Sequence, residues 1–243
     1  MTASAAPGKL YLIPTLLGGE DVSRCIPAYN IAIIRSLRHF VVEELRSARR
    51  FLKKTDPSFP IDQCTFHELN EHTRTLDSRL LLAPIATGES VGLLSEAGLP
   101  CVADPGADLV AAAQERNIQV VPLIGPSSIL SALMASGLCG QRFSFHGYLP
   151  REKEELLRKI RRMESDSARD ASAQIFIETP YKNNQLWELL LQSCQEETLL
   201  CVAANITLDN EYIVTKTVRN WKKCCRPDLH KQPALFIIQR SFN

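Results

Sequence analysis

Short apolar runs alternate with longer segments whose apolar residues recur at helical spacing. The short runs predict strands and the longer segments predict helices. In the first half of the chain the predicted strands are Lys9–Pro14, His39–Glu43, Cys64–Leu69, Val91–Ser95 and Gln119–Leu123. The helices predicted between them are Ile26–Leu37, Leu45–Lys54, Thr73–Thr87 and Ala107–Arg116, with Pro84 expected to kink or interrupt the third. This alternation favours a mostly parallel sheet covered by helices.

The second half repeats these signals in a less regular order. Its predicted strands are Phe143–Tyr148, Ala173–Glu178, Leu199–Ala204, Glu211–Thr215 and Ala234–Arg240. Its predicted helices are Ser127–Ser136 (closed by Gly137), Glu152–Met163 and Asn184–Ser193, and the polar run Ser165–Ser172 predicts a surface loop. We therefore expect an α/β protein of two α/β domains, residues 1–124 and 125–243, with a ligand cleft between them.

Composition and charge narrow the class of protein. The chain has 243 residues, 45% apolar and 23% charged, and no apolar run approaches the ~18 residues of a spanning helix. The N-terminus lacks the features of a secretory signal. Eight cysteines include no C-x-x-C pair and none has histidine at zinc-ligand spacing, so we expect no metal site and a reducing, cytoplasmic compartment. A net charge of +1 argues weakly against a nucleic-acid ligand, so the distribution of charge must decide.

The most informative segment is Val91–Gly106, VGLLSEAGLPCVADPG. A buried strand stops at a loop of small residues, and ligands of α/β proteins bind at such strand ends. Asp104, before Pro105 and Gly106, is interpreted as the N-cap of the next helix. A simple strand–turn–helix connection would explain this segment alone. A second loop of the same kind, Gly125-Pro126-Ser127-Ser128, favours a ligand site.

An ordered set of motifs then resembles one known family. LYLIPTLLGG, FVVEELRSARRFLKK, FHELNE, LLSEAGLPCVADPG, PLIGPSS, FHGYLPR and FIETPYK are similar to motifs of the tetrapyrrole methylase superfamily. Within it they are most similar to the ribosomal RNA small-subunit methyltransferase I group. The resemblance runs from about Lys9 to about Lys182. It implies two α/β domains that hold S-adenosylmethionine in their cleft, a homodimer, and methylation of a cytidine 2′-hydroxyl in the RNA of the small ribosomal subunit.

The resemblance also assigns residues to the cofactor, which we call the cofactor positions. They are Pro14, Ser95, Glu96, Ala97, Gly98, Val102, Ser127, Ser128, Tyr148, Thr179, Ala203 and Ala234. Some motifs depart from the group's usual spelling. Glu44-Leu45 stand where the group has Asp-Thr, and the run Asn205–Leu208 lacks both charged members of a Glu-Leu-Thr-Lys motif.

Candidate catalytic residues follow from the chemistry. Methyl transfer from a sulfonium needs mainly the positioning of donor and acceptor, and a ribose hydroxyl benefits from a base or hydrogen-bond acceptor. Glu43 and Glu68 lie at the ends of predicted strands and could accept that proton, and Arg46 could hold a phosphate or steady Glu43. Surface pairing of these charges is the alternative.

Four cations at helical spacing form what we call the basic stripe: Arg46, Arg49, Arg50 and Lys53. A solvated helix face would explain it, and beside a cleft it would serve as a track for RNA phosphates. Trp221 lies among a further group of cations, but core packing is its expected role, as for Phe143 and Phe145.

Three functions remain open. The first is an S-adenosylmethionine-dependent ribose methyltransferase acting on ribosomal RNA or the small subunit. The second is a methyltransferase of a small, tetrapyrrole-like molecule. The third is a degenerate protein that binds S-adenosylmethionine without turnover. The basic stripe and the motif spellings favour the first.

Overall fold

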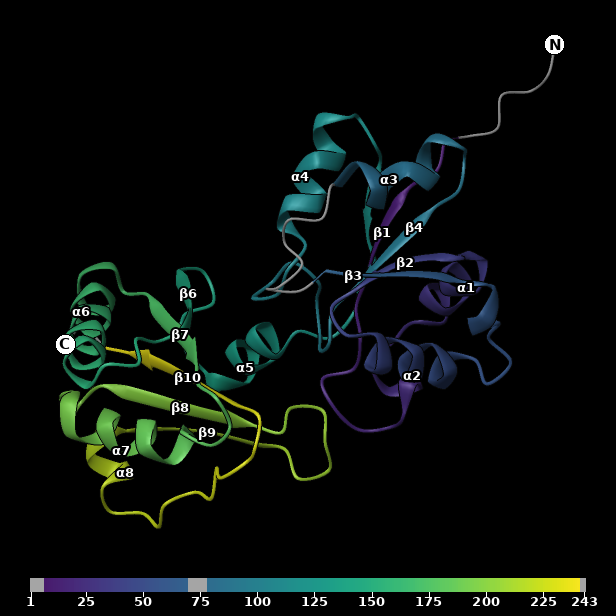
Figure 1. Ribbon diagram of the computed structural model, residues 1–243. Helices are drawn as coiled ribbons and strands as arrows, with labels where there is room; N and C mark the ends of the chain where they lie inside the picture. The colour runs from purple at the N-terminus through teal and green to yellow at the C-terminus, as the bar shows by residue number, and fades with distance from the viewer. Residues whose placement is uncertain (1–6, 70–77, 241–243) are drawn as a thin grey trace. The chain divides into compact units, whose positions relative to one another are not determined.

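The computed structural model describes residues 7–69 and 78–240, which form two compact units (Figure 1). The first unit ends at Ser127 and the second begins at Ser128. The sequence analysis places the division between residues 124 and 125. Each unit contains one five-stranded sheet and is described here by itself.

The sheet of the first unit is entirely parallel. Its strands are β1 (Leu10–Ile13), β2 (His39–Val42), β3 (Thr65–Glu68), β4 (Val91–Leu94) and β5 (Val120–Pro122), in the order β3-β2-β4-β1-β5. The strand β4 is buried at all four positions, as expected for a central strand with both faces covered. These five strands confirm the strand predictions of the first half to within a residue or two.

Helices cover both faces of this sheet (Figure 1). The helices α1 (Ala28–Ser36) and α2 (Leu45–Thr55) pack on one face, in a core that includes Phe40. The helices α3 (Ser78–Ala86) and α4 (Ala107–Glu115) pack on the other face. Pro84 lies inside α3 without interrupting it, and the first part of the helix predicted from Thr73 lies outside the described residues. Two short 3-10 helices, Val22–Arg24 and Ile61–Gln63, were not predicted.

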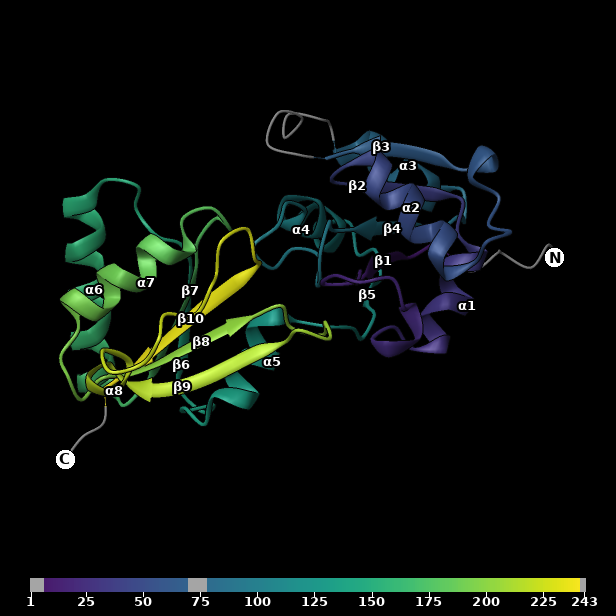
Figure 2. The same cartoon turned by 90° about the horizontal axis from the view of Figure 1, so that it is seen from below.

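The second unit has a mixed sheet in the order β6-β7-β10-β8-β9. Its strands are β6 (Phe143–Tyr148), β7 (Ala173–Ile177), β8 (Leu199–Ala204), β9 (Tyr212–Thr217) and β10 (Ala234–Gln239). Only β6 and β7 pair in parallel. The helices α6 (Lys153–Asp170), α7 (Asn183–Ser193) and α8 (Val218–Trp221) pack on one face, and α5 (Ser128–Ser136) lies on the other (Figure 2).

Two expectations for the second unit are wrong. The polar run Ser165–Ser172 is not a surface loop, because α6 continues to Asp170. Buried Ser167 donates from Oγ to the carbonyl of Ser172 at 2.7 Å and accepts from the Arg240 amide. Phe143 is 42% exposed on the edge strand β6, and Phe145 is only half-buried, so neither is a core residue. Trp221, by contrast, is 1% exposed, which confirms its core role.

In the part of the chain that the structure describes, none of the helices combines the length and the apolar character that a membrane crossing requires.

Candidate functional site

The carboxyl edge of the first sheet brings several predicted residues side by side. Leu94 of β4 is level with Ile13 of β1 and with Val42 of β2. The next residues along these strands, Ser95, Pro14 and Glu43, therefore leave the sheet at the same edge. The connections after β1 and β2 lead to helices on one face, and the connection after β4 leads to α4 on the other. Chains that part in this way leave a crevice at a topological switch point, where ligands of α/β proteins bind.

Thr15 joins the loops that follow β1 and β4. Its amide donates to the carbonyl of Gly98 at 2.9 Å, and its hydroxyl donates to the carbonyl of Ser95 at 3.2 Å. The Ser95 hydroxyl donates to the same Gly98 carbonyl at 3.1 Å. Thr15 is 3% exposed, so these bonds hold the two loops in one buried network. The sequence analysis did not single out Thr15, and a lone threonine after a strand carries no signal that would have found it.

Two glycines let these loops approach closely. Gly98 adopts a φ of +78°, which side-chain-bearing residues rarely adopt. Gly125, in the loop after β5, packs on Pro14 so tightly that an added Cβ would lie 2.3 Å from the Cβ and Cγ atoms of the proline. The three loops after β1, β4 and β5 thus form one closely packed floor at this edge.

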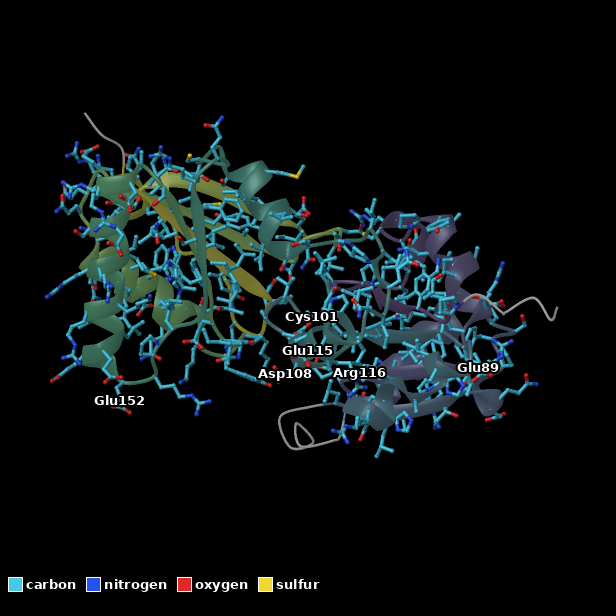
Figure 3. The ribbon with its side chains drawn as sticks, turned by 90° about the horizontal axis from the view of Figure 1, so that it is seen from above. Glu89, Cys101, Asp108, Glu115, Arg116 and Glu152 are labelled. Carbon is cyan, nitrogen blue, oxygen red and sulfur yellow. The ribbon has the colours of Figure 1, made fainter. Side chains whose placement is uncertain are left out.

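The loop after β4 is strained beyond its glycines. Cys101 and Ala103 both have positive φ, of 67° and 65°, which costs each of them about 1 kcal/mol or more. Figure 3 shows Cys101 at the carboxyl edge of the sheet and Glu89, which precedes β4, toward the opposite edge. Strain of this kind tends to gather where a ligand is bound. Burial raises the pKa of the Cys101 thiol to about 11, so it is protonated at neutral pH and is no nucleophile.

The structure corrects the interpretation of Asp104. The N-cap of α4 is Gly106, with a φ of 123°, and Asp104 does not cap the helix. Its carboxyl group is half-buried near Glu43 and Glu96, and burial followed by these two negative charges raises its pKa to about 7. We call these three residues the acidic group. Three carboxyl groups close together favour a cationic ligand at this edge.

The neighbouring glutamates differ in what they bind. Glu43 accepts from the Glu96 amide at 3.4 Å, which links β2 to the loop after β4. Glu44 is the N-cap of α2, and its carboxylate accepts from the amides of Arg46 and Ser47. These two amide hydrogen bonds lower the pKa of Glu44. Glu44, which stands where the methyltransferase I group has aspartate, therefore caps α2 in this fold.

Glu68 also supports the start of α2. It ends β3, level with Val42, and its Oε1 accepts from the Leu45 amide at 3.0 Å. A carboxylate at a helix N-terminus stabilises the helix and its dipole. The structure thus places Glu68 beside the predicted site, where its hydrogen bond positions the start of α2.

The basic stripe starts at this edge and is exposed along α2. Within the described residues, none of its four cations forms an ion pair with a carboxylate. Three cations of α6 behave differently, since Arg158, Arg162 and Arg169 pair with acids one turn away on the same helix. A stripe of cations without such pairs is better suited to phosphates than an ordinary solvated face.

The cofactor positions of the second unit gather at one edge of its sheet. Tyr148 is level with Ile177 of β7, Ile177 with Leu235 of β10, and Leu235 with Ala203 of β8. Ala234 immediately precedes Leu235, and Thr179 lies two residues past Ile177. Ser127 and Ser128 lead into α5 and are half-buried. The loop after β8 carries positive φ at Asn205 and Thr207, so it is strained in the same way as the loop after β4.

Comparison with known proteins agrees with this geometry. The sequence profile of the tetrapyrrole (corrin/porphyrin) methylases matches residues 9–221. The ribosomal RNA small subunit methyltransferase I of Synechocystis is 31% identical over 209 residues, which are 84% of this chain and 69% of that protein. The protein of the same name from Streptococcus pyogenes is 31% identical over 206 residues, 84% of this chain and 67% of its own length. The chain thus spans about two thirds of the length of these relatives.

Solved structures share the fold at low sequence identity. The methyltransferase CobJ has a TM-score of 0.63 at 19% identity and covers 96% of this chain and 95% of its own. The uroporphyrin-III-C-methyltransferase of Thermus thermophilus has a TM-score of 0.55 at 18% identity and covers 96% and 92%. The family profile and the relatives above show that this chain is a methyltransferase and belongs to the tetrapyrrole methylase family.

Proposed function

We propose that this protein transfers a methyl group from S-adenosylmethionine to a ribose 2′-hydroxyl of small-subunit ribosomal RNA. The observation that carries the proposal is the carboxyl edge of the first sheet, where a floor of small residues, the acidic group and the start of the basic stripe lie together. The relatives named for the methylation of small-subunit ribosomal RNA support the acceptor.

The residues at this edge suit S-adenosylmethionine. The cofactor supplies a methyl group already activated on a positively charged sulfur. Gly98 and Gly125 let the loops after β1, β4 and β5 pack closely, and internal hydrogen bonds fix the backbone of residues 95–98 as a preformed floor. The acidic group compensates the cofactor's positive charge, which an apolar pocket would not do. Tyr148, Thr179, Ala203 and Ala234 of the second unit stay proposed cofactor positions.

On the acceptor side we assign distinct roles to the three proposed catalytic residues. Glu43, in the acidic group, accepts the hydrogen bond of the ribose hydroxyl and takes its proton as the oxygen–carbon bond forms and the carbon–sulfur bond breaks. Glu68 holds the start of α2 through the Leu45 amide and so positions Arg46. Arg46 binds a phosphate next to the acceptor ribose, and the rest of the basic stripe binds neighbouring phosphates.

The basic stripe distinguishes an RNA acceptor from a small tetrapyrrole. Four cations that form no ion pair with a carboxylate in residues 7–69 and 78–240 fit a polyanion, and a small molecule would need few of them. We also propose a cytoplasmic location, which a ribosomal acceptor supports. We further propose a homodimer, since α5 exposes Leu130 and Met134, which are 47% and 84% accessible.

Methyl transfer itself tests the proposal. Small ribosomal subunits that lack the modification are incubated with the protein and labelled S-adenosylmethionine, and nuclease digestion locates the label. We expect label on a single ribose. Cofactor binding without label on any RNA would refute the proposed acceptor.

A further inference from the structure

A separate hollow of about 570 Å³ lies on the first unit, between α2 and the segment that leads into β3. Arg49, Arg50 and Lys53 of α2 line one side, and residues 58–63 line the other. We call it the α2 hollow. Its volume falls within the range of small-molecule and cofactor pockets.

The α2 hollow lies away from the reaction edge. Residues 58–63 precede β3, so they lie toward the amino edge of the parallel sheet, whereas Glu43 and Ser95 lie at the carboxyl edge. The helix α2 connects the two places. Arg46 is in its first turn and Lys53 in its last, and seven residues of α-helix span about 10 Å. A ligand chain that contacts Arg46 at the reaction edge can therefore follow α2 to the hollow.

Two of the three cations that line the hollow are held in place by groups other than carboxylates. The guanidinium of Arg49 lies over the ring of Phe66, 5.3 Å from its centre. The Nζ of Lys53 donates to the carbonyl of Pro57 at 3.1 Å. Asp62 is the one acid among the lining residues, so a net positive charge faces the hollow. Fixed cations attract an anion at lower entropic cost than mobile ones do.

The other wall offers contacts of a different kind. Pro60 and Ile61 present apolar surface, and Ser58, Asp62 and Gln63 add hydroxyl, carboxylate and amide groups. Cations on one side, with apolar and hydrogen-bonding groups on the other, match a nucleotide, which has a phosphate, a flat base and polar base edges.

We propose that the α2 hollow binds one nucleotide of the substrate RNA, distinct from the nucleotide that is methylated. Arg50 and Lys53 bind its phosphate, and its base rests against Pro60 and Ile61 within reach of Gln63. This inference rests on the proposed function, because it takes RNA as the substrate. It adds a specificity site that reads the RNA beyond the methylated ribose.

The test separates filling of the hollow from attraction by charge. Gln63→Trp fills the hollow and leaves every cation in place, and the Gln63 side chain makes no hydrogen bond within the described residues. Arg50→Gln combined with Lys53→Gln removes charge and leaves the hollow open. The matched control is Arg158→Gln with Arg162→Gln on α6, where both arginines are exposed and paired with acids. Binding of unmodified small-subunit ribosomal RNA is measured against salt concentration, with cofactor binding and thermal melting on the same samples.

We expect Gln63→Trp to weaken RNA binding about tenfold with an unchanged salt slope. The double charge variant should reduce the slope of log K against log salt by about 1 to 2, and the control pair should change neither quantity. Should Gln63→Trp lower the melting temperature, Ser58→Tyr serves as a second filling variant: it keeps the amide bond to Asp56 and loses the hydroxyl bond to the same carboxylate, so its melting temperature is measured too.

The outcomes distinguish this proposal from the proposed function. Unchanged RNA binding by both filling variants would overturn the α2 hollow even if the protein methylates RNA. Weakened binding by the filling variants, without any methyl transfer, would support the hollow and refute the enzyme. Failure of the unaltered protein to bind the RNA would overturn both.

Discussion

Replacing Asp104 with asparagine should stabilise the protein at alkaline pH. The Asp104 carboxyl group is half-buried, and burial together with the charges of Glu43 and Glu96 raises its pKa from 3.8 to about 7. In the unfolded chain its pKa is about 3.9, so above pH 7 the folded state carries a charge that the unfolded state solvates better. The shift corresponds to about 4 kcal/mol at full effect. Because the group is only half-buried, solvent screening reduces the expected gain to roughly 1–2 kcal/mol.

The sign of the pH dependence follows from linkage. The folded state takes up a proton at Asp104 as the pH falls through 7, whereas the unfolded state takes it up only near pH 3.9. This difference stabilises the folded state at low pH, and the stabilisation is lost as the pH rises through 7. The difference between Asp104→Asn and the unaltered protein should therefore be largest near pH 8 and small near pH 4. Denaturant unfolding at both pH values measures it. Asp108→Asn, at an exposed position in the first turn of α4, is the matched control and should show no such pH dependence.

The same carboxylate links stability to cofactor binding. If the acidic group faces the positive charge of S-adenosylmethionine, the cofactor should bind more tightly at pH 8 than at pH 6, and Asp104→Asn should remove most of this difference. S-adenosylhomocysteine, which lacks the sulfonium charge, should show a smaller dependence. A variant no more stable than the unaltered protein at pH 8, with an unchanged pH dependence of binding, would refute the reasoning.

Substitutions at three further positions test the site. Gly125→Ala places a Cβ 2.3 Å from Pro14 and should weaken S-adenosylmethionine binding at least tenfold by calorimetry; normal binding would show that the two loops are not held together as described. Glu68→Gln keeps an oxygen that can accept from the Leu45 amide, so its melting temperature and methyl transfer should match those of the unaltered protein. Glu68→Ala should lower both quantities. Loss of activity in Glu68→Gln without a lower melting temperature would make Glu68 a base. Glu43→Gln should lower kcat by about 100-fold with little change in the Kd of the cofactor, and an unchanged kcat would exclude Glu43 as the proton acceptor.

Much of the first unit could be predicted because its strands are short, apolar and separated by amphipathic helices. For a parallel sheet that is buried on both faces, this pattern is compatible with few alternative assignments of strands and helices. Register explains why residues as distant in sequence as Pro14, Glu43 and Ser95 meet: each follows a strand that ends at the same level. The sequence indicates where each strand ends, and the parallel pairing of the strands brings these ends close together.

The details that the sequence could not supply depend on contacts between distant segments. Asp104 fits the preference of an N-cap, yet Gly106 takes that place and the aspartate turns toward two other carboxylates. The Ser-rich end of α6 resembles a loop, because nothing local shows that Ser167 is satisfied by Ser172 and Arg240. Thr15 links two loops through groups that any threonine carries, and only the fold brings Ser95 and Gly98 within its reach.

The most direct test of the central claim is transfer of labelled methyl from S-adenosylmethionine to small ribosomal subunits that lack the modification. The account predicts label on one ribose 2′-oxygen in the small-subunit RNA, and its loss in Glu43→Gln under conditions where the cofactor still binds. Label on a tetrapyrrole instead, or no label on the subunits while the protein binds S-adenosylmethionine, would contradict it.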